Sequence, residues 1–268
     1  MRSPGVAFDL RAALSDEIRA AIEQINTAPL KAKAIHRCRV HLKRARALAR
    51  VGREVAPGLS SVFNDSARAL MQALSHARDL AALAQAARIA ARKAAKKEAA
   101  ALRSIADALE ARSAATQPPN AETIAAGLRD LMAMAQVWPE ASARQIQKGG
   151  ERIVRRARKA RRLSQGSRLA MRRHEWRKRE KDRLYAAMLL EGYWPAGTPR
   201  RVKANEQLGE ALGLERDALL LADALGQEPN LAGDAKSARR ASQAIARRLR
   251  KLGRRADDLG DKLHAGGA

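Results

Sequence analysis

Apolar residues recur along most of the chain at the three- and four-residue spacing that is typical of amphipathic helices. The clearest stripe consists of Leu10, Leu14, Ile18, Ile22 and Ile25. The strict alternation of apolar and polar positions that marks a half-buried strand forms no convincing run. The pattern therefore predicts an all-α chain, with one face of each helix packed against a core.

Proline, glycine and polar clusters divide this pattern into successive helices. We expect a first helix that ends before Pro29, followed by helices at about 30–55, 60–75, 78–112, 121–137, 141–164, 168–192, 202–213, 215–226 and 235–262. The segment 115–120 contains two adjacent prolines and is the best candidate for a linker. We therefore expect two helical units, residues 1–118 and 119–268.

The composition adds a strong positive charge to this helical picture. The 268 residues carry 53 Lys and Arg against 28 Asp and Glu, a net charge of +25, and 46% of them are hydrophobic. The apolar fraction and the length are enough for a sizeable core, so the chain is not a disordered basic tail. Positive charges in such excess repel one another, and they indicate a polyanionic partner.

A single cysteine, Cys38, rules out an intrachain disulfide and a zinc site with several cysteines. It indicates a reducing compartment. The first ten residues lack the apolar core of a secretory signal, and no apolar run approaches the 18 residues of a membrane span. We expect a cytoplasmic protein without membrane insertion.

An internal repeat relates the two halves at an offset of 138 positions. The offset superimposes His36 on His174, Arg39 on Arg177, Lys43 on Lys181, Pro57 on Pro195, and the pair Arg78-Asp79 on Arg216-Asp217. A rare histidine, a proline and an Arg-Asp pair at one offset indicate duplication of a helical unit. We expect the two aspartates of the Arg-Asp pairs to be structural, through helix-start capping and an ion pair.

Cations form rows that border the apolar faces of four predicted helices. On a helical wheel the row of the first copy spans about 80° and consists of His36, Arg39, Lys43, Arg46 and Arg50. The second copy matches it with His174, Arg177 and Lys181, and two further rows include Arg152, Arg155, Lys159, Arg247 and Lys251. Like charges gather at the edge of a core only if an anion lies between them. Cations one helical turn apart, about 5–6 Å, could follow a linear polymer of phosphates.

Motifs for catalysis or metal binding are absent from the sequence. It contains no H-E-x-x-H pair, Walker loop, dinucleotide fingerprint or nucleophile elbow. His36 and His41 are about 140° apart around a helix and cannot share one ion. We therefore expect a protein that is not an enzyme and needs no metal or cofactor.

Three stretches together resemble the CHAD family, an α-helical domain named for its histidines. They are HEWRKREKDRLY from residue 174, ERIVRRARKARR from residue 151 and IHRCRVHLKRARAL from residue 35. The resemblance implies two four-helix-type bundles, related by approximate two-fold symmetry, with a central basic pore or groove that binds inorganic polyphosphate. It adds Arg44, Arg156 and Lys178 to the candidate binding residues found from the rows.

The sequence departs from the family pattern at Val154, Glu180 and Leu184, where other residue types are expected. Family members often carry a tunnel-shaped triphosphate hydrolase with an E-x-E-x-K strand, and this chain has no such motif. The resemblance therefore implies a standalone binding module, recruited to polyphosphate granules.

Three alternatives remain open from the sequence. A nucleic-acid-binding protein would explain the charge, although seven aromatic residues offer few stacking platforms. A scaffold on the granule surface would use polyphosphate only as a tether. A phosphohydrolase is disfavoured because the sequence lacks clustered carboxylates for metal ions.

Overall fold

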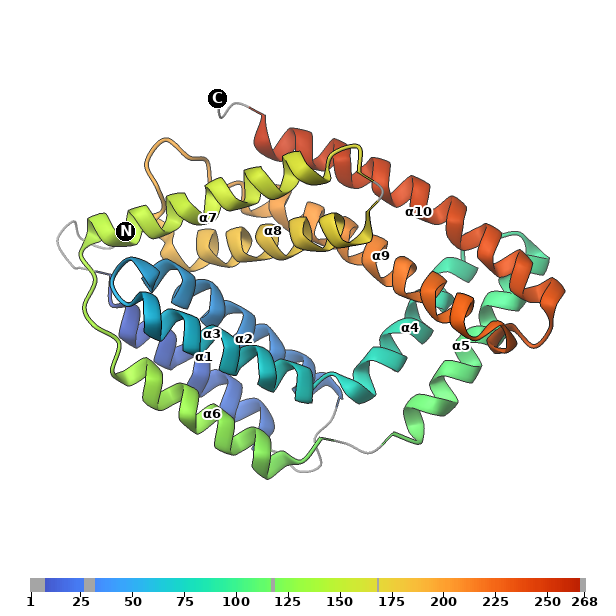
Figure 1. Ribbon diagram of the computed structural model, residues 1–268, viewed down its shortest axis with the longest axis horizontal. Helices are drawn as coiled ribbons and strands as arrows, with labels where there is room; N and C mark the ends of the chain where they lie inside the picture. The colour runs from blue at the N-terminus through green and yellow to red at the C-terminus, as the bar shows by residue number, and fades with distance from the viewer. Residues whose placement is uncertain (1–7, 27–31, 117–118, 168, 266–268) are drawn as a thin grey trace.

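The computed structural model describes residues 8–26, 32–116, 119–167 and 169–265, and over them the protein contains helices and no strands (Figure 1). The α-helices are α1 (Leu10–Ile25), α2 (Ala32–Val51), α3 (Pro57–Ala73), α4 (His76–Ala91), α5 (Lys96–Ala114), α6 (Ala121–Gln136), α7 (Ala143–Ser164), α8 (Ala170–Leu190), α9 (Val202–Gln227) and α10 (Ala235–His264). Short 3-10 turns follow α2, α8 and α9, at Gly52–Glu54 (η1), Glu191–Tyr193 (η2) and Pro229–Ala232 (η3). The all-α prediction is confirmed. None of the described helices has the length and apolar character of a membrane span.

The single helix expected over 78–112 is wrong, because α4 and α5 form a hairpin there. The chain turns between Ala91 and Lys96, and the Glu98 carboxylate accepts a hydrogen bond from the backbone N–H of Ala95 at 3.3 Å at the start of α5. The turn contains neither proline nor glycine. Packing of the alanine-rich faces of the two helices produces this turn, and no local signal in the sequence marks it.

The two helices expected at 202–213 and 215–226 are also wrong, because α9 runs through both without a break. Gly213 lies inside α9 with an ordinary helical backbone. The side on which it has no side chain faces a neighbouring helix. A Cβ at this position would lie 3.5 Å from an Arg177 nitrogen of α8. The glycine therefore marks a contact between two helices and not a helix end.

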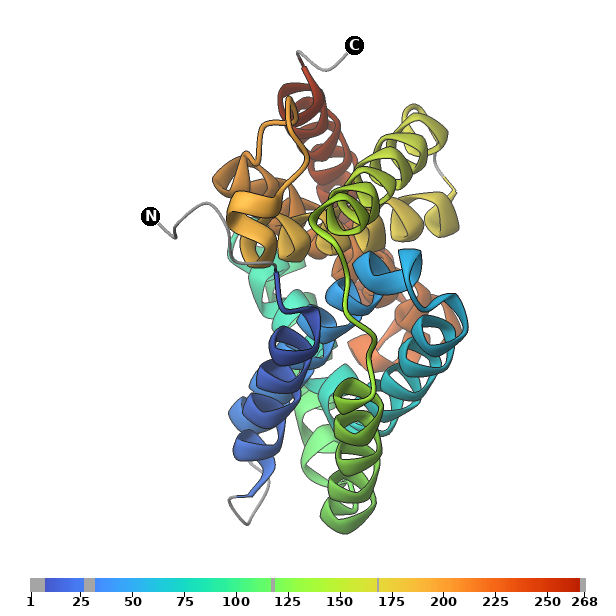
Figure 2. The same cartoon turned by 90° about the vertical axis from the view of Figure 1, so that its left-hand side faces the viewer.

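The first core lies between α1, α2, α3 and α6, with contributions from α7 and α8. Its largest buried side chains include Leu14, Ile18, Leu42, Phe63 and Trp138. Helix α6 adds Ile124, Leu128 and Leu131 to this core. Figure 2 shows α1 and α6 in the lower half of the molecule, with α7 and α10 in the upper half. Helix α6 lies beyond the boundary expected at 118/119, yet it completes the core of the preceding helices.

The second core joins α4 and α5 to the distal ends of α9 and α10 (Figure 1). Leu102 and Ile105 of α5 pack there with Leu221 of α9 and Ile245 of α10. A third, smaller core around Trp176 is formed by residues of α7, α8, α9 and α10. The cores therefore combine helices from before and after residue 118.

The 138-residue offset of the sequence repeat maps several helices of the first half onto helical residues of the second half. It carries residues 32–51 of α2 onto 170–189, within α8, and residues 96–114 of α5 onto 234–252, close to the first part of α10. It carries the C-terminal part of α3, residues 64–73, and most of α4 onto the single helix α9. The helices that the offset pairs therefore follow one another in the same order in both halves of the chain. The exception is the break between α3 and α4, which has no counterpart in α9.

Candidate anion-binding site

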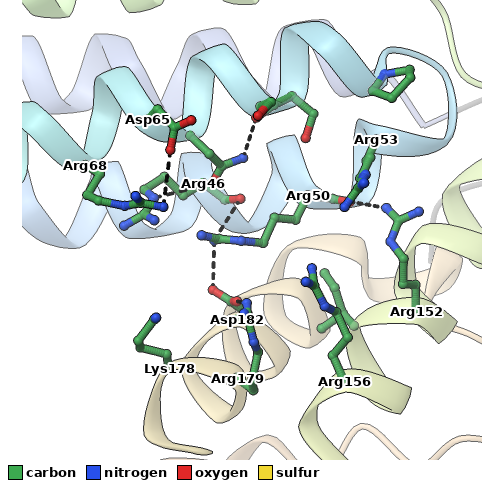
Figure 3. Close-up of a pocket in the computed structure, with 15 residues that line it drawn as sticks. Arg46, Arg50, Arg53, Asp65, Arg68, Arg152, Arg156, Lys178, Arg179 and Asp182 are labelled. Atoms are coloured by element: carbon green, nitrogen blue, oxygen red, sulfur yellow. Dashed lines mark hydrogen bonds and ion pairs between the residues drawn. The ribbon is translucent and has the colours of Figure 1, made fainter. Parts of the chain in front are cut away.

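A basic cavity of about 300 Å³ lies between the C-terminal part of α2, the helix α3, and the facing helices α7 and α8 (Figure 3). Its cationic side chains are Arg46, Arg50, Arg53, Arg68, Arg152, Arg156, Lys178 and Arg179. Asp65 and Asp182 are its two acidic residues, and the remaining lining is Pro57, Ser60, Ser61, Asn64 and Ile153. Eight positive charges against two negative ones in the lining make an anion a more favourable occupant of this cavity than a cation.

Helical spacing places the cations of each helix on the side that faces the cavity. Arg46 and Arg50 lie one turn apart on α2, and Arg152 and Arg156 lie one turn apart on α7. The neighbouring face of α2 is buried in the first core through Leu42 and other residues, which fixes the direction of its cationic row. In Figure 3 the arginines of α2 and α3 face those of α7 and α8 across the cavity.

Close approach of α7 to α2 depends on Gly149. A Cβ on this residue would lie 2.9 Å from the Cα of Val51, inside the contact distance of the α2 backbone. Arg152 follows within one turn, pairs with Glu54, and donates a hydrogen bond to the backbone carbonyl of Arg50 at 2.5 Å. The absent side chain thus lets α7 bring its cations next to those of α2.

Acidic side chains already neutralise some of these cations. The Asp182 carboxylate accepts a hydrogen bond from Arg50 at 2.9 Å and another from Arg179 at 3.3 Å. Asp65 pairs with Arg68 at 3.2 Å. In the free protein, Asp182 therefore occupies a position that an incoming anion would otherwise take.

Arg53 and Arg156 have no such partner. Neither makes a hydrogen bond or an ion pair with another residue in the described part of the chain. Partial desolvation of its side chain lowers the pKa of Arg156, and the charges of Arg179 and Arg53 lower it further. Burial, with the charge of Arg50, lowers the pKa of Arg46 to about 10. The cavity thus destabilises its own positive charges, and a bound anion would relieve that repulsion.

Of the sixteen binding residues predicted from the sequence, the structure places five in the lining of this cavity: Arg46, Arg50, Arg152, Arg156 and Lys178. It missed three further cations of the lining, Arg53, Arg68 and Arg179. Arg53 continues the α2 row by one turn, and this spacing was available as a signal. Arg68 and Arg179 stand outside the rows and reach the cavity only because α3 and α8 pack beside α2.

The predicted residues of the second copy form another group, between α8 and α9. The Nδ1 atom of His174 accepts a hydrogen bond from Arg216, since a guanidinium group can only donate. Lys181 lies beside Gly209, where a Cβ would be 3.3 Å from its Nζ, and its Nζ is 5.7 Å from the Tyr185 ring centroid. His174, Arg177 and Lys181 therefore lie outside the lining of the cavity.

His174 is uncharged at neutral pH in the free protein. Burial lowers its pKa to about 4, and the charges of Arg216, Lys178 and Arg177 act in the same direction. Because its folded pKa lies below the ordinary value, protonation would cost stability as the pH falls. The neutral ring carries its hydrogen on Nε2, because Nδ1 accepts from Arg216.

The N-terminal part of the α2 row also lies outside the cavity lining. This group comprises His36, Arg39, Lys43 and Arg44. Arg39 donates to the backbone carbonyl of Met71, and Arg44 lies 3.8 Å from Glu17. The cationic row predicted for α2 is therefore divided, and its C-terminal end alone reaches the cavity.

The other predicted residues are spread over three helices. Arg155 and Lys159 are exposed on α7, and Arg155 pairs with Glu151 at 3.4 Å. Arg247 of α10 pairs with Glu98 at 2.6 Å beside the second core, and Lys251 is exposed on the next turn of α10. The structure does not bring these four residues into the cavity.

The two aspartates expected to be structural differ in position. Asp79 lies in the first turn of α4, where an acidic residue is favourable for the helix. Asp217 lies in the interior of α9 and so does not begin a helix. Among the described residues, no group of three or more His, Cys, Asp or Glu side chains is placed to hold a metal ion.

Comparisons with known proteins agree with this architecture. The family model described as the CHAD domain matches residues 12–226. The crystal structure of the CHAD domain from the plant Ricinus communis superimposes with a TM-score of 0.66 at 19% sequence identity, covering 99% of this chain and 96% of that chain. No curated protein matches the chain. At this identity the structural match shows a shared fold.

Proposed function

The chain belongs to the CHAD domain family, and we propose that it binds inorganic polyphosphate in the cavity between α2, α3, α7 and α8. The observation that carries the proposal is the lining of this cavity, in which eight Lys and Arg side chains from four helices and η1 face two Asp side chains. Such an excess of cations at one place is costly in the free protein and is offset when a polyanion binds.

The spacing of the cations suits a linear polymer of phosphates. The pair Arg46 and Arg50 and the pair Arg152 and Arg156 each lie one helical turn apart, which is about 5–6 Å along the axis. The two pairs come from different helices and so approach a bound chain from two sides. Guanidinium groups can contact phosphate oxygens through two parallel hydrogen bonds, which favours arginine in this role.

The proposal is binding without a chemical step. Asp65 and Asp182 each pair with arginines, so the lining favours an anion over a metal ion that would activate water. In the cell, binding would recruit the protein to polyphosphate granules. The cations outside the cavity, such as Lys159 and Lys43, would hold the parts of a long chain that extend beyond it.

A competition experiment tests the proposal. The protein is titrated with labelled polyphosphate of about 100 units and with labelled single-stranded DNA, and each is challenged with the other at equal phosphate concentration. We expect polyphosphate to displace DNA while DNA leaves polyphosphate bound, and we expect affinity to fall steeply with salt as counterions are released. Displacement of polyphosphate by DNA would instead favour a nucleic-acid-binding protein.

Replacing Asp182 by Asn is expected to strengthen polyphosphate binding about five- to tenfold, because Arg50 no longer has to leave a carboxylate and Arg179 keeps only its pair with Glu175. Asp182 holds Arg50 and Arg179 in the free protein. The change is measured by titration at fixed salt. Asp130→Asn, an exposed position on α6, is the matched control for loss of one negative charge. Weaker binding by the Asp182 variant would mean that this carboxylate positions the arginines and does not compete with the ligand.

A further inference from the structure

A second hollow, of about 330 Å³, lies between α4, α9 and α10, and it shares no lining residue with the basic cavity. Its walls are Ala81, Ala82, Gln85, Ala86 and Ile89 of α4, Leu214, Asp217 and Ala218 of α9, and Arg248 of α10. The volume is at the lower end of the range for small-molecule pockets, about 300–1,000 Å³. The proposed polyphosphate function leaves this hollow unused.

The hollow exists because α4 presents short side chains to its neighbours. Ala82 and Ala86 lie one turn apart on α4 and are half-buried, and Ile89 lies on the next turn. Leu214 and Ala218 of α9 form the facing wall. Alanine reaches too short a distance to fill the space between two helices, so an apolar surface remains open to a ligand.

Among the residues that the structure describes, Arg248 is the one cation in the lining of this hollow. Arg248 is half-buried, and it makes no hydrogen bond or ion pair with any residue that the structure describes. Burial lowers the pKa of this guanidinium group. Most other half-buried arginines of the molecule have a carboxylate or a carbonyl partner, as Arg50 and Arg152 do. An anionic group is therefore the partner that this site lacks.

The lining of this hollow contains few charged side chains. Among the described residues they are Arg248 and Asp217, and Asp217 already has an interaction partner. A ligand with one negative charge is enough to pair with Arg248. The site is thus distinct in chemistry from the basic cavity, where cations outnumber acids by eight to two.

We propose that this hollow binds a small amphiphilic carboxylate, with its apolar body against Ala82, Ala86 and Leu214 and its carboxylate paired with Arg248. The planar guanidinium group suits two parallel hydrogen bonds to a carboxylate. The aliphatic body gains by leaving water for the walls of α4 and α9.

Isothermal titration calorimetry with decanoate tests this inference on the full chain. We expect one decanoate per protein, and we expect decanol, which has the same chain without the charge, to bind at least about tenfold more weakly because it gains no charge-assisted hydrogen bond. Arg248→Gln should weaken decanoate binding by a similar factor. Arg239→Gln, an exposed arginine of the same helix, is the matched control and should leave binding unchanged.

Filling the hollow separates this site from general attraction to a basic protein. Ala86→Leu adds apolar surface without changing any charge, and we expect it to abolish decanoate binding while polyphosphate binding stays unchanged. Circular dichroism verifies that the variants are folded. The inference is overturned if decanol binds as tightly as decanoate, if Arg248→Gln and Arg239→Gln weaken binding equally, or if folded Ala86→Leu still binds decanoate.

Discussion

Replacing Arg53, Arg156 and Lys178 together by glutamine is expected to weaken polyphosphate binding about 100-fold or more, because each charge-assisted hydrogen bond contributes about 1.5–3 kcal/mol before screening. All three side chains are exposed and line the basic cavity. Within the described residues, Arg53 and Arg156 pair with no acid, and Lys178 pairs only with Glu175 on its own helix, at 2.8 Å. The substitutions therefore remove binding charge with little effect on the fold.

The salt dependence of binding gives a second measure of the same variant. The slope of log affinity against log salt is expected to fall by roughly 2, since each lost phosphate contact removes about 0.7–0.9. A triple variant of Lys96, Lys97 and Arg103 to glutamine serves as control, because these exposed α5 residues carry the same charge outside the cavity. Equal losses in both triple variants would mean that net charge, and not this cavity, binds the polymer.

Substituting Arg173 by Met is expected to lower the free energy of unfolding at pH 7 by about 3–5 kcal/mol, because it leaves a buried acid without its cation. Arg173 is 6% exposed, and its Nε and terminal nitrogens donate to Glu215 at 3.0 and 2.9 Å. It also pairs with Asp257 and lies 5.0 Å from the ring centroid of Trp176 in the third core. One side chain thus joins α8 to α9 and α10.

The loss should depend on pH in a defined direction. Burial raises the pKa of Glu215, and the hydrogen bond and charge of Arg173 oppose that rise. Without Arg173 the folded-state pKa moves further above the unfolded one. A carboxyl group shifted in this way favours the folded state at low pH, and its contribution is lost as the pH rises through the folded pKa. The variant should therefore lose less stability at pH 5 than at pH 7.

Urea denaturation of the Arg173→Met variant at both pH values measures this effect. Adding Glu215→Gln to it should recover part of the loss at pH 7, since the unpaired charge is removed, and should abolish most of the pH dependence. An equal loss at pH 5 and pH 7 would show that Arg173 contributes through packing against Trp176 and not through its ion pairs.

Helical periodicity predicted most of this fold because each helix buries one face of its own sequence. The α2 row and Leu42 on the adjoining face could both be read from residue spacing, and so could the pairs of cations on α2 and α7. The turn between α4 and α5 could not, because it contains no proline or glycine and depends on the packing of two alanine-rich faces. Gly213 led to the opposite error, a predicted helix end where α9 continues, because its conformation in α9 is an ordinary helical one.

The candidate site was predicted only in part for a related reason. A helical wheel shows which side chains share a face, but it does not show which neighbouring helix covers each turn. Arg39 and Arg50 belong to one row, yet Arg39 meets the carbonyl of Met71 in α3 while Arg50 meets Asp182 of α8. Arg68 and Arg179 reach the cavity through tertiary packing alone, and no pattern along the chain marks them.

The distribution of the cores over both halves of the chain has a consequence during synthesis. Glu98 pairs with Arg247, which lies 149 positions later, and the α4–α5 hairpin has its main partners in α9 and α10. At about 5–20 residues per second, the ribosome needs roughly 7–26 s to make the intervening stretch of about 130 residues. During that time the inner face of the α4–α5 hairpin remains uncovered. Because that face consists mainly of alanine, it exposes little apolar area per residue, which limits its tendency to aggregate before α9 and α10 arrive.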